Sequence, residues 1–170
     1  MTSAPPFPRE IESDPCVPAL RAALAARVHP LWREATMRVS TVPLDATLAA
    51  ALGRAGAGTL VLGLEAATTV LAREAHGLAA VDARGGAARP ARISRLLLLA
   101  ADGAERFYRA AESLARRHGA RLLVCRLDAP ASALGHVVLG RPVGVKAVLV
   151  QHKQVVAAVL RAMAGVADAA

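Results

Sequence analysis

Three short apolar runs decide the fold class of this chain: Leu96-Leu-Leu-Leu99, Leu122-Leu-Val-Cys125 and Ala147-Val-Leu-Val150. Each run is too short to be a helix, and segments with helical periodicity separate them. Short apolar runs between helices of about 10–15 residues are typical of buried parallel strands in βαβ units. The stretch from Arg95 to Val150 therefore predicts an α/β fold.

The length and composition of the chain fit one domain with a terminal extension. Of its 170 residues, 55% are hydrophobic, but only two Phe, one Trp and one Tyr are aromatic, so we expect a core of Leu, Val and Ala. The formal net charge of +8 permits binding to nucleic acid or to another anionic surface. Abundant Ala and Arg also reflect GC-rich coding, so the charge alone does not identify a partner.

The cysteines and the hydropathy pattern favour a cytoplasmic protein. Cys16 and Cys125 are too few for a disulfide framework, and nothing indicates an oxidising compartment. No apolar run approaches the roughly 18–20 residues that span a membrane. Prolines and acidic residues stand near the N-terminus, where a signal peptide would have an apolar stretch. We therefore expect a cytoplasmic protein with no membrane partner.

Residues 1–42 are predicted to form an N-terminal extension. The Pro-rich residues 1–15 predict a disordered start, and a helix is expected at about 17–28. The apolar face of that helix consists of Val17, Leu20, Leu24 and Val28. The helix could cap the main domain or bind a partner, including a second copy of the chain.

Residues 43–170 are predicted to form the main domain. Helices are expected at 44–52, 63–76, 102–118, 130–139 and from 152 onward, with strands at 59–62, 96–99, 122–125 and 147–150. Gly77 is expected to end the second of these helices, and residues 78–91 to form a loop or a hairpin insertion. Because βαβ crossovers are right-handed, this order predicts a three-layer α/β/α sandwich with a mixed, mostly parallel four-stranded sheet.

Two carboxylates follow predicted strands, at the edge where α/β sheets bind ligands. Asp102 and Asp128 could hold a metal or transfer a proton in a small enzyme. An Asp at such a position more often caps the following helix, because its side chain accepts hydrogen bonds from exposed backbone N–H groups. Asp102 with Glu105 also resembles a capping box. We interpret both as caps and predict a non-catalytic protein, with the enzyme as the minor alternative.

The sequence predicts neither a metal site nor a cofactor. Five histidines occur, but none has a metal-ligand spacing to a cysteine or to another histidine. His76 and His118 are instead expected at helix C-termini, where a donor favours the exposed carbonyls. The motifs of Walker A loops, GxGxxG, GxSxG and HExxH do not occur.

Two turns offer a place for phosphate. Gly63 opens a helix, and the N–H groups and positive dipole end of a helix N-terminus favour an anion. Arg141 and Lys146 flank a second turn, before the last predicted strand. If both turns lie on one side of the sheet, they form a basic rim for an RNA backbone; otherwise the charges are only solvated.

Four segments of the main domain occur in a characteristic order: Ala57-Gly-Thr-Leu-Val-Leu-Gly-Leu-Glu-Ala-Ala-Thr-Thr-Val-Leu71, Leu98-Leu-Ala-Ala-Asp102, Arg117-His-Gly-Ala-Arg-Leu-Leu-Val124, and Gly140-Arg-Pro142 before Val145-Lys-Ala-Val148. Together they resemble the ribosomal-protein superfamily that binds kink-turn RNA, the L-seven-Ae and L-thirty-e type. The resemblance covers residues 44–164 with an insertion at 78–91. It implies an α/β/α fold and binding to structured RNA.

The resemblance extends to the scaffold but not to the usual RNA-reading side chains. Glu65 stands where the family has an RNA-contacting Asn, Ala66 where it has Glu, and Thr69 where it has Lys. A carboxylate repels phosphate, and the Ala66 side chain cannot accept a hydrogen bond from a base edge. Contacts to the RNA backbone through the two turns remain open to this chain.

The sequence thus predicts a non-catalytic RNA-binding or ribosome-associated protein, whose partner is structured RNA such as rRNA. The predicted RNA-binding residues are Gly63, Leu64, Glu65, Thr69, Arg141, Val143 and Lys146. The alternative is a protein-interaction or oligomerisation module on the same fold that has lost RNA binding. The changed residues in the first turns of the Gly63 helix and the additional N-terminal helix favour this alternative.

Overall fold

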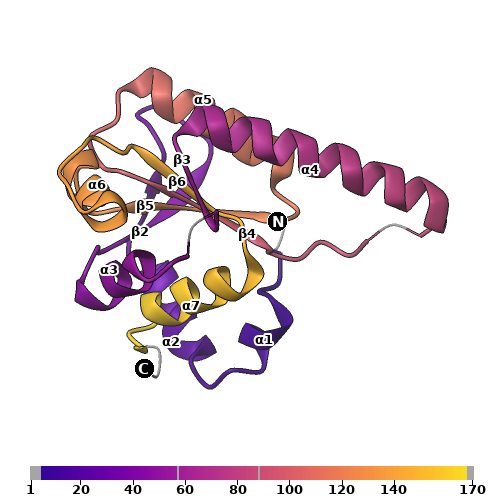
Figure 1. Cartoon of the computed structure of the whole chain (residues 1–170), viewed down its shortest axis with the longest axis horizontal. Helices are drawn as coiled ribbons and strands as arrows, with labels where there is room; N and C mark the ends of the chain where they lie inside the picture. Colours follow the sequence, from indigo (N-terminus) through magenta and orange to yellow (C-terminus); the bar gives the residue numbers. More distant parts are fainter. Residues whose placement is uncertain (1–4, 57, 88, 168–170) are drawn as a thin grey trace.

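One mixed sheet with strand order β1-β2-β5-β4-β6-β3 organises the chain (Figure 1). The computed structural model describes residues 5–56, 58–87 and 89–167. Within them the strands are β1 (Val28–Pro30), β2 (Arg38–Val42), β3 (Leu60–Leu62), β4 (Arg95–Leu99), β5 (Leu122–Leu127) and β6 (Ala147–Val150). The helices are α1 (Arg9–Glu12), α2 (Val17–Ala26), α3 (Ala46–Gly53), α4 (Leu64–Gly85), α5 (Glu105–His118), α6 (Ala131–Leu139) and α7 (Lys153–Met163).

The α/β class is confirmed, but the predicted four-stranded, mostly parallel sheet is wrong. β5 lies parallel to β2 and β4, whereas β6 is antiparallel to β4 and β3, and β1 is antiparallel to β2. The direction of β6 follows from the short helix before it. α6 starts near the end of β5, and the turn after α6 returns the chain to that same place, where Val145 N donates to Ala131 O at 3.0 Å. β6 therefore runs opposite to β5.

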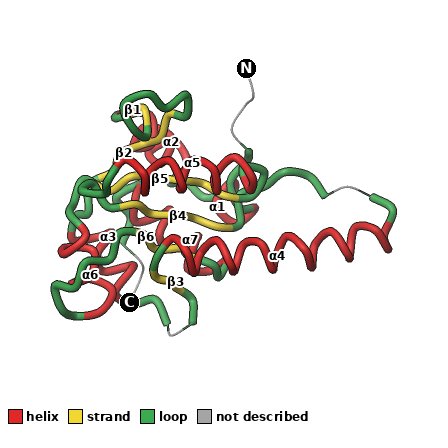
Figure 2. Tube along the Cα trace, turned by 90° about the horizontal axis from the view of Figure 1, so that it is seen from above, coloured by secondary structure: helices red, strands yellow, loops and turns green. Residues whose placement is uncertain are grey.

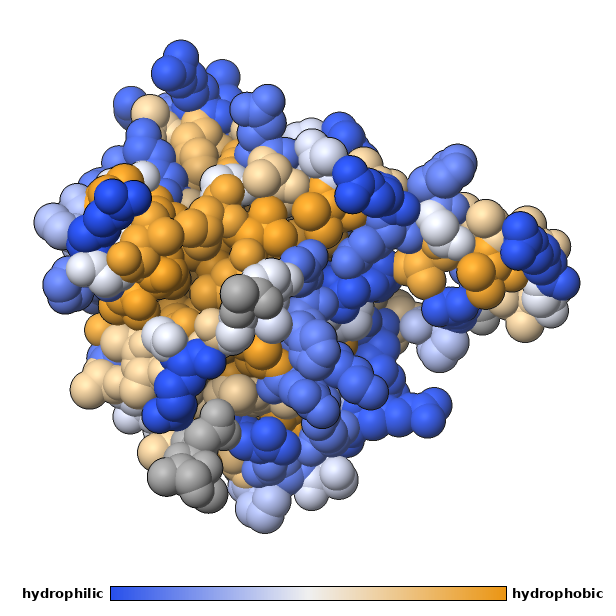
Figure 3. Space-filling model, in the orientation of Figure 1, coloured by the Kyte–Doolittle hydropathy of each residue, from blue (hydrophilic) through white to orange (hydrophobic). Residues whose placement is uncertain are grey.

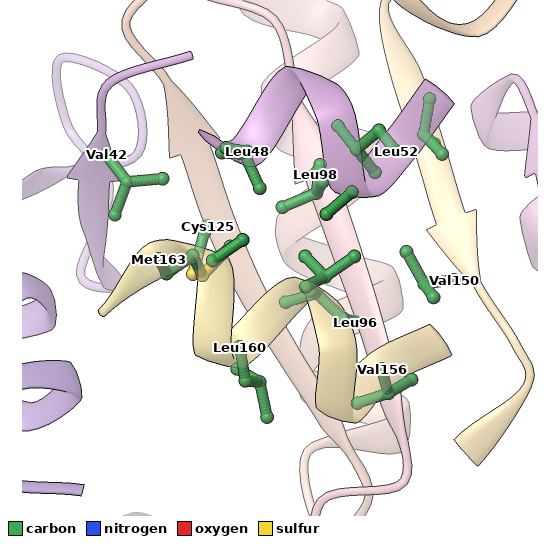
Figure 4. Close-up of a cluster of buried hydrophobic side chains, with 14 of the residues drawn as sticks. Val42, Leu48, Leu52, Leu96, Leu98, Cys125, Val150, Val156, Leu160 and Met163 are labelled. Atoms are coloured by element: carbon green, nitrogen blue, oxygen red, sulfur yellow. The ribbon is translucent and has the colours of Figure 1, made fainter. Parts of the chain in front are cut away.

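Helices pack on both faces of the sheet because alternate strand residues point to opposite sides. On one face Leu96 and Leu98 of β4 lie in a core with α1, α2, α3, α6 and α7. Figure 4 shows part of this core, where Leu48 of α3 and Leu160 of α7 surround the β4 side chains. On the other face Leu97 and Leu99 pack against α4 and α5.

Residues 5–42 pack into this fold. Ser40 of β2 pairs with Cys125 of β5, and Phe7 and Ile11 are buried in the same core as β4. The predicted disorder is therefore wrong for residues 5–15, while residues 1–4 lie outside the described part. The predicted helix at 17–28 is present as α2, which ends at Ala26, because the next residues turn into β1.

Two carboxylates hold the N-terminal segment to the rest of the chain. Asp14 accepts a hydrogen bond from Nε of Arg161 on α7 at 2.7 Å, and this bond lowers the pKa of Asp14 to about 2. Glu112 of α5 accepts from the Trp32 indole at 2.5 Å and from Met37 N at 3.3 Å. Burial opposes ionisation of Glu112, but the hydrogen bonds from Arg116, Trp32 and Met37 outweigh it and lower its pKa.

The helix α4 continues well beyond its expected end. It passes through Gly77 as far as Gly85, and Gly86, with φ 69°, ends it in the left-handed conformation that favours glycine. A single helical glycine costs only about 1 kcal/mol relative to Ala, and the alanines around it are strong helix formers. The predicted loop at 78–91 is thus helical in its first half, and His76 lies inside the helix. Figure 2 shows the distal half of α4 projecting past the sheet.

Candidate nucleic-acid interface

The two predicted turns lie side by side at the carboxyl end of β3 and β4. Gly63 is the N-cap of α4 with φ 94°, a conformation that L side chains rarely adopt. Its N–H donates to Ala147 O at 2.8 Å, directly after Leu62 pairs with Val148. Gly63 is therefore bonded to the residue that follows Lys146, so the start of α4 adjoins the end of the second turn.

The turn at residues 140–146 is held by backbone contacts along its length. Gly140 adopts φ 70° and donates to His136 O at 2.9 Å, which ends α6. Ala100 N donates to Lys146 O at 2.8 Å, so the turn is also tied to β4. Its chain passes so close to α6 that a Cβ on Gly135 would lie 1.6 Å from Val143 O. This turn is therefore fixed in position against α6.

The side chains of the turn are presented to solvent. Arg141 and Lys146 are exposed, and neither forms an ion pair with another described residue. Val143 and Leu139 are also exposed, at 45% and 40%. Figure 3 shows an apolar area on this face, over α6 and the neighbouring edge strand β3. The surface thus combines two free cations with apolar contact area.

The predicted residues on α4 have mixed roles. Leu64 is half-buried and packs against the core beneath α4. Glu65 and Thr69 are exposed, but the Thr69 hydroxyl donates to Glu65 O at 3.2 Å and so bonds to its own helix. The Glu65 carboxylate lies in the first turn of α4, where the helix dipole favours a negative charge. These residues thus form a helix N-terminus that favours an anion, but the carboxylate of Glu65 there would repel one.

Both candidate catalytic carboxylates have structural partners. The Asp102 carboxylate accepts from Ala131 N at 2.8 Å and so caps α6, not α5 as predicted, since Ala104 is the N-cap of α5. Asp128 is not a cap, because α6 has Pro130 at that position. Its carboxylate accepts from Arg27 at 2.6 Å, and this bond lowers the pKa of Asp128.

Tyr108 was missed by the sequence reasoning, although it shapes the loop beside the turn. Its hydroxyl donates to Ala100 O at 2.6 Å and accepts from Gly103 N at 3.0 Å. The guanidinium of Arg126 lies 5.2 Å from the centre of its ring. A buried tyrosine needs a hydrogen-bond partner for its hydroxyl, and this requirement could have indicated that Tyr108 bonds to a neighbouring loop.

Across the described ranges, no group of three or more His, Cys, Asp or Glu side chains could hold a metal ion. None of the described helices is both long enough and apolar enough to cross a membrane.

No protein-family model matches the sequence, and no curated protein matches it.

Proposed function

We propose that this protein is a non-catalytic RNA-binding protein that contacts the phosphate backbone through the helix N-terminus that Gly63 opens, and through Arg141 and Lys146. The observation that carries the proposal is the hydrogen bond from Gly63 N to Ala147 O, because it joins the α4 N-terminus to the basic turn. Phosphate is favoured by both a helix N-terminus and unpaired cations. The class of partner is structured RNA, such as rRNA.

The arrangement favours recognition of RNA shape over reading of base edges. Val143 and Leu64 offer apolar contact for sugars or unstacked bases, while Arg141 and Lys146 reach phosphate. Glu65 repels the backbone at the position where an amide would read a base. We therefore expect binding to several structured RNAs, with weak preference for a kink-turn stem over other structured RNAs.

A second candidate function is binding to another protein, and the edge strand β3 favours it. Among the described strands only β6 pairs with β3, and Leu60, Val61 and Leu62 are all partly exposed. Together with Val143 and Leu139 they form an apolar surface that could bind a strand from a partner. The N-terminal helix α2 no longer supports this alternative, because its Leu20 is buried in the core of the chain itself.

The test is RNA binding measured by fluorescence anisotropy across a salt series. Total rRNA fragments and a kink-turn stem serve as probes. We expect a linear fall of log K with log salt, and a slope that decreases by about 0.9 for each of the changes Arg141→Ala and Lys146→Ala. Arg33→Ala is the matched control, because Arg33 is exposed in the β1–β2 loop at the opposite end of the sheet.

The two candidate functions give different results in this experiment. An absence of RNA binding at low salt would end the RNA proposal. A concentration-dependent dimer or a captured strand, sensitive to Val61→Lys but not to Lys146→Ala, would favour the protein-binding alternative.

A further inference from the structure

A groove of about 550 Å³ lies at the end of the sheet opposite to Gly63. The distal half of α4 forms one side, residues 89–94 form the second, and residues 117–121, from the end of α5 to the start of β5, form the third. Figure 1 shows α4 running past the sheet and the chain returning from its tip to β4. This volume is within the range of small-molecule sites.

One part of the groove wall is apolar. Ala75, Leu78 and Ala79 line it from α4, and Pro90 and Ala91 line it from the returning segment. None of these side chains can donate or accept a hydrogen bond, so they suit the uncharged body of a ligand rather than its polar group.

The remaining wall is mainly basic, although Asp82, Ser94, His118 and Ala120 also line it. Arg89, Arg92, Arg117 and Arg121 line the groove, and Arg95 shares the carboxylate of Glu74 with Arg121. The carboxylates that pair with them are Asp82 with Arg89, Glu12 with Arg92, and Glu74 with Arg95 and Arg121. Five guanidinium groups against three carboxylates leave an excess of two positive charges.

Arg117 and Arg121 are the cations with unused capacity. Arg117 is exposed and makes no ion pair with a described residue. Arg121 is 29% exposed and lies 3.5 Å from Glu74, too far for a strong hydrogen bond, while its Nε donates to Ser94 Oγ at 3.1 Å. Burial is the main cause that lowers the pKa of Arg121, and the nearby Arg95 lowers it further, while Glu74 acts in the opposite direction.

We propose that this groove binds a phosphate monoester carried on an apolar or planar body of about the size of a mononucleotide. A phosphate monoester carries a charge of about −1.5 to −2 at neutral pH, which matches the two excess positive charges. Guanidinium groups bind phosphate through two parallel hydrogen bonds, and Arg117 and Arg121 both line the groove. The body of the ligand lies against Leu78 and Pro90.

The test is isothermal titration of the full chain with three probes: adenosine 5′-monophosphate, adenosine and inorganic phosphate. We expect the monophosphate to bind, phosphate to bind at least about tenfold more weakly, and adenosine to show no binding below about 1 mM. Arg117→Ala should weaken binding of the monophosphate about tenfold. Arg106→Ala is the matched control, since Arg106 is exposed on the first turn of the same helix α5.

A second pair of variants tests the groove without touching its charges. Ala75→Trp fills the apolar wall and should abolish binding of the monophosphate, whereas Ala72→Trp, also on α4 but outside the groove, should not. Circular dichroism confirms that each variant is folded. The double variant Arg141→Ala, Lys146→Ala should bind the monophosphate as the wild type does, because its changes lie at the other end.

Three results would overturn the proposal. The first is an absence of binding by the monophosphate at millimolar concentration. The second is that a groove variant binds the monophosphate as its control does, whether Arg117→Ala as Arg106→Ala or Ala75→Trp as Ala72→Trp. The third is RNA binding that Arg117→Ala weakens while mononucleotides do not bind, which would make the groove an RNA contact instead.

Discussion

The two ends of the sheet are built in different ways. At the carboxyl end of β4, backbone hydrogen bonds from Gly63 and Ala100 tie the ends of β3 and β4 to Ala147 and Lys146. At the amino end, a projecting helix lines the groove, and side-chain ion pairs lie beside it, chiefly that of Glu74 with Arg95. The carboxyl end therefore carries exposed charges on a backbone that hydrogen bonds hold in place. At the amino end, the groove instead depends on ion pairs beside the projecting helix α4.

The largest expected effect on the free energy of unfolding is that of a methyl group added at Gly135. At the carboxyl end we predict that Gly135→Ala destabilises the protein by about 3 kcal/mol or more, because its Cβ would lie 1.6 Å from Val143 O and the fixed turn must move. Urea unfolding measures the change. A loss below about 0.5 kcal/mol would show that the turn yields easily and is not held as described.

Removal of one charge at the amino end should have the next largest effect. Glu74→Gln leaves the Arg95 guanidinium, whose side chain is 18% exposed, without its bidentate partner. We predict a loss of about 2 kcal/mol in the free energy of unfolding. The control Glu65→Gln, at the exposed start of α4, should change it by less than about 0.5 kcal/mol. Equal effects of both changes would argue against the ion-pair network.

A methyl group added at Gly77 should instead stabilise the projecting helix α4. Gly77 lies inside α4, and a Cβ there would meet no atom within 4 Å. Because Ala favours a helix over Gly, we predict that Gly77→Ala raises the free energy of unfolding by about 0.5–1 kcal/mol. Thermal unfolding measures it. A destabilised Gly77→Ala protein would mean that α4 does not continue through this residue.

The smallest effect concerns pH at the amino end. Burial, followed by the charges of Arg117 and Arg121, lowers the pKa of His118 below 6.5. As the pH falls, His118 therefore takes up a proton at a higher pH in the unfolded chain than in the folded one. The free energy of unfolding should then fall as the pH drops below about 6.5, and level off below the folded pKa. Unfolding at pH 7.5 and 5.5 measures this fall, which should be smaller in His118→Asn. An unchanged fall would assign it to other groups.

The sequence was sufficient where local pattern decides the structure. The apolar runs at Leu96, Leu122 and Ala147 are strands, and Gly63 does open a helix. No strand was predicted at β2, because its residues alternate irregularly and it is a strand through its pairing with β1 and β5. The predicted end of α4 at Gly77 is wrong, because a single glycine among strong helix formers does not end a helix.

The candidate interface could be predicted only in part. The exposed Arg141 and Lys146 follow from their position in a polar turn. The proximity of Lys146 to Gly63 depends on the insertion of β6 between β4 and β3, which no local pattern reveals. The arginine groove depends on the length of α4 and on residues distant in sequence, so its charges were visible in the sequence but their convergence was not.

Amide chemical-shift mapping with a structured RNA tests the central claim most directly. We expect shifts at Gly63, Leu64, Arg141 and residues 143–146, and at Ala79 and Arg117 only those shifts that added salt alone also produces. Shifts that cluster at the groove instead, or an absence of shifts at Gly63 and Lys146 under saturating RNA, would contradict the assignment of the RNA-binding surface to the carboxyl end of the sheet.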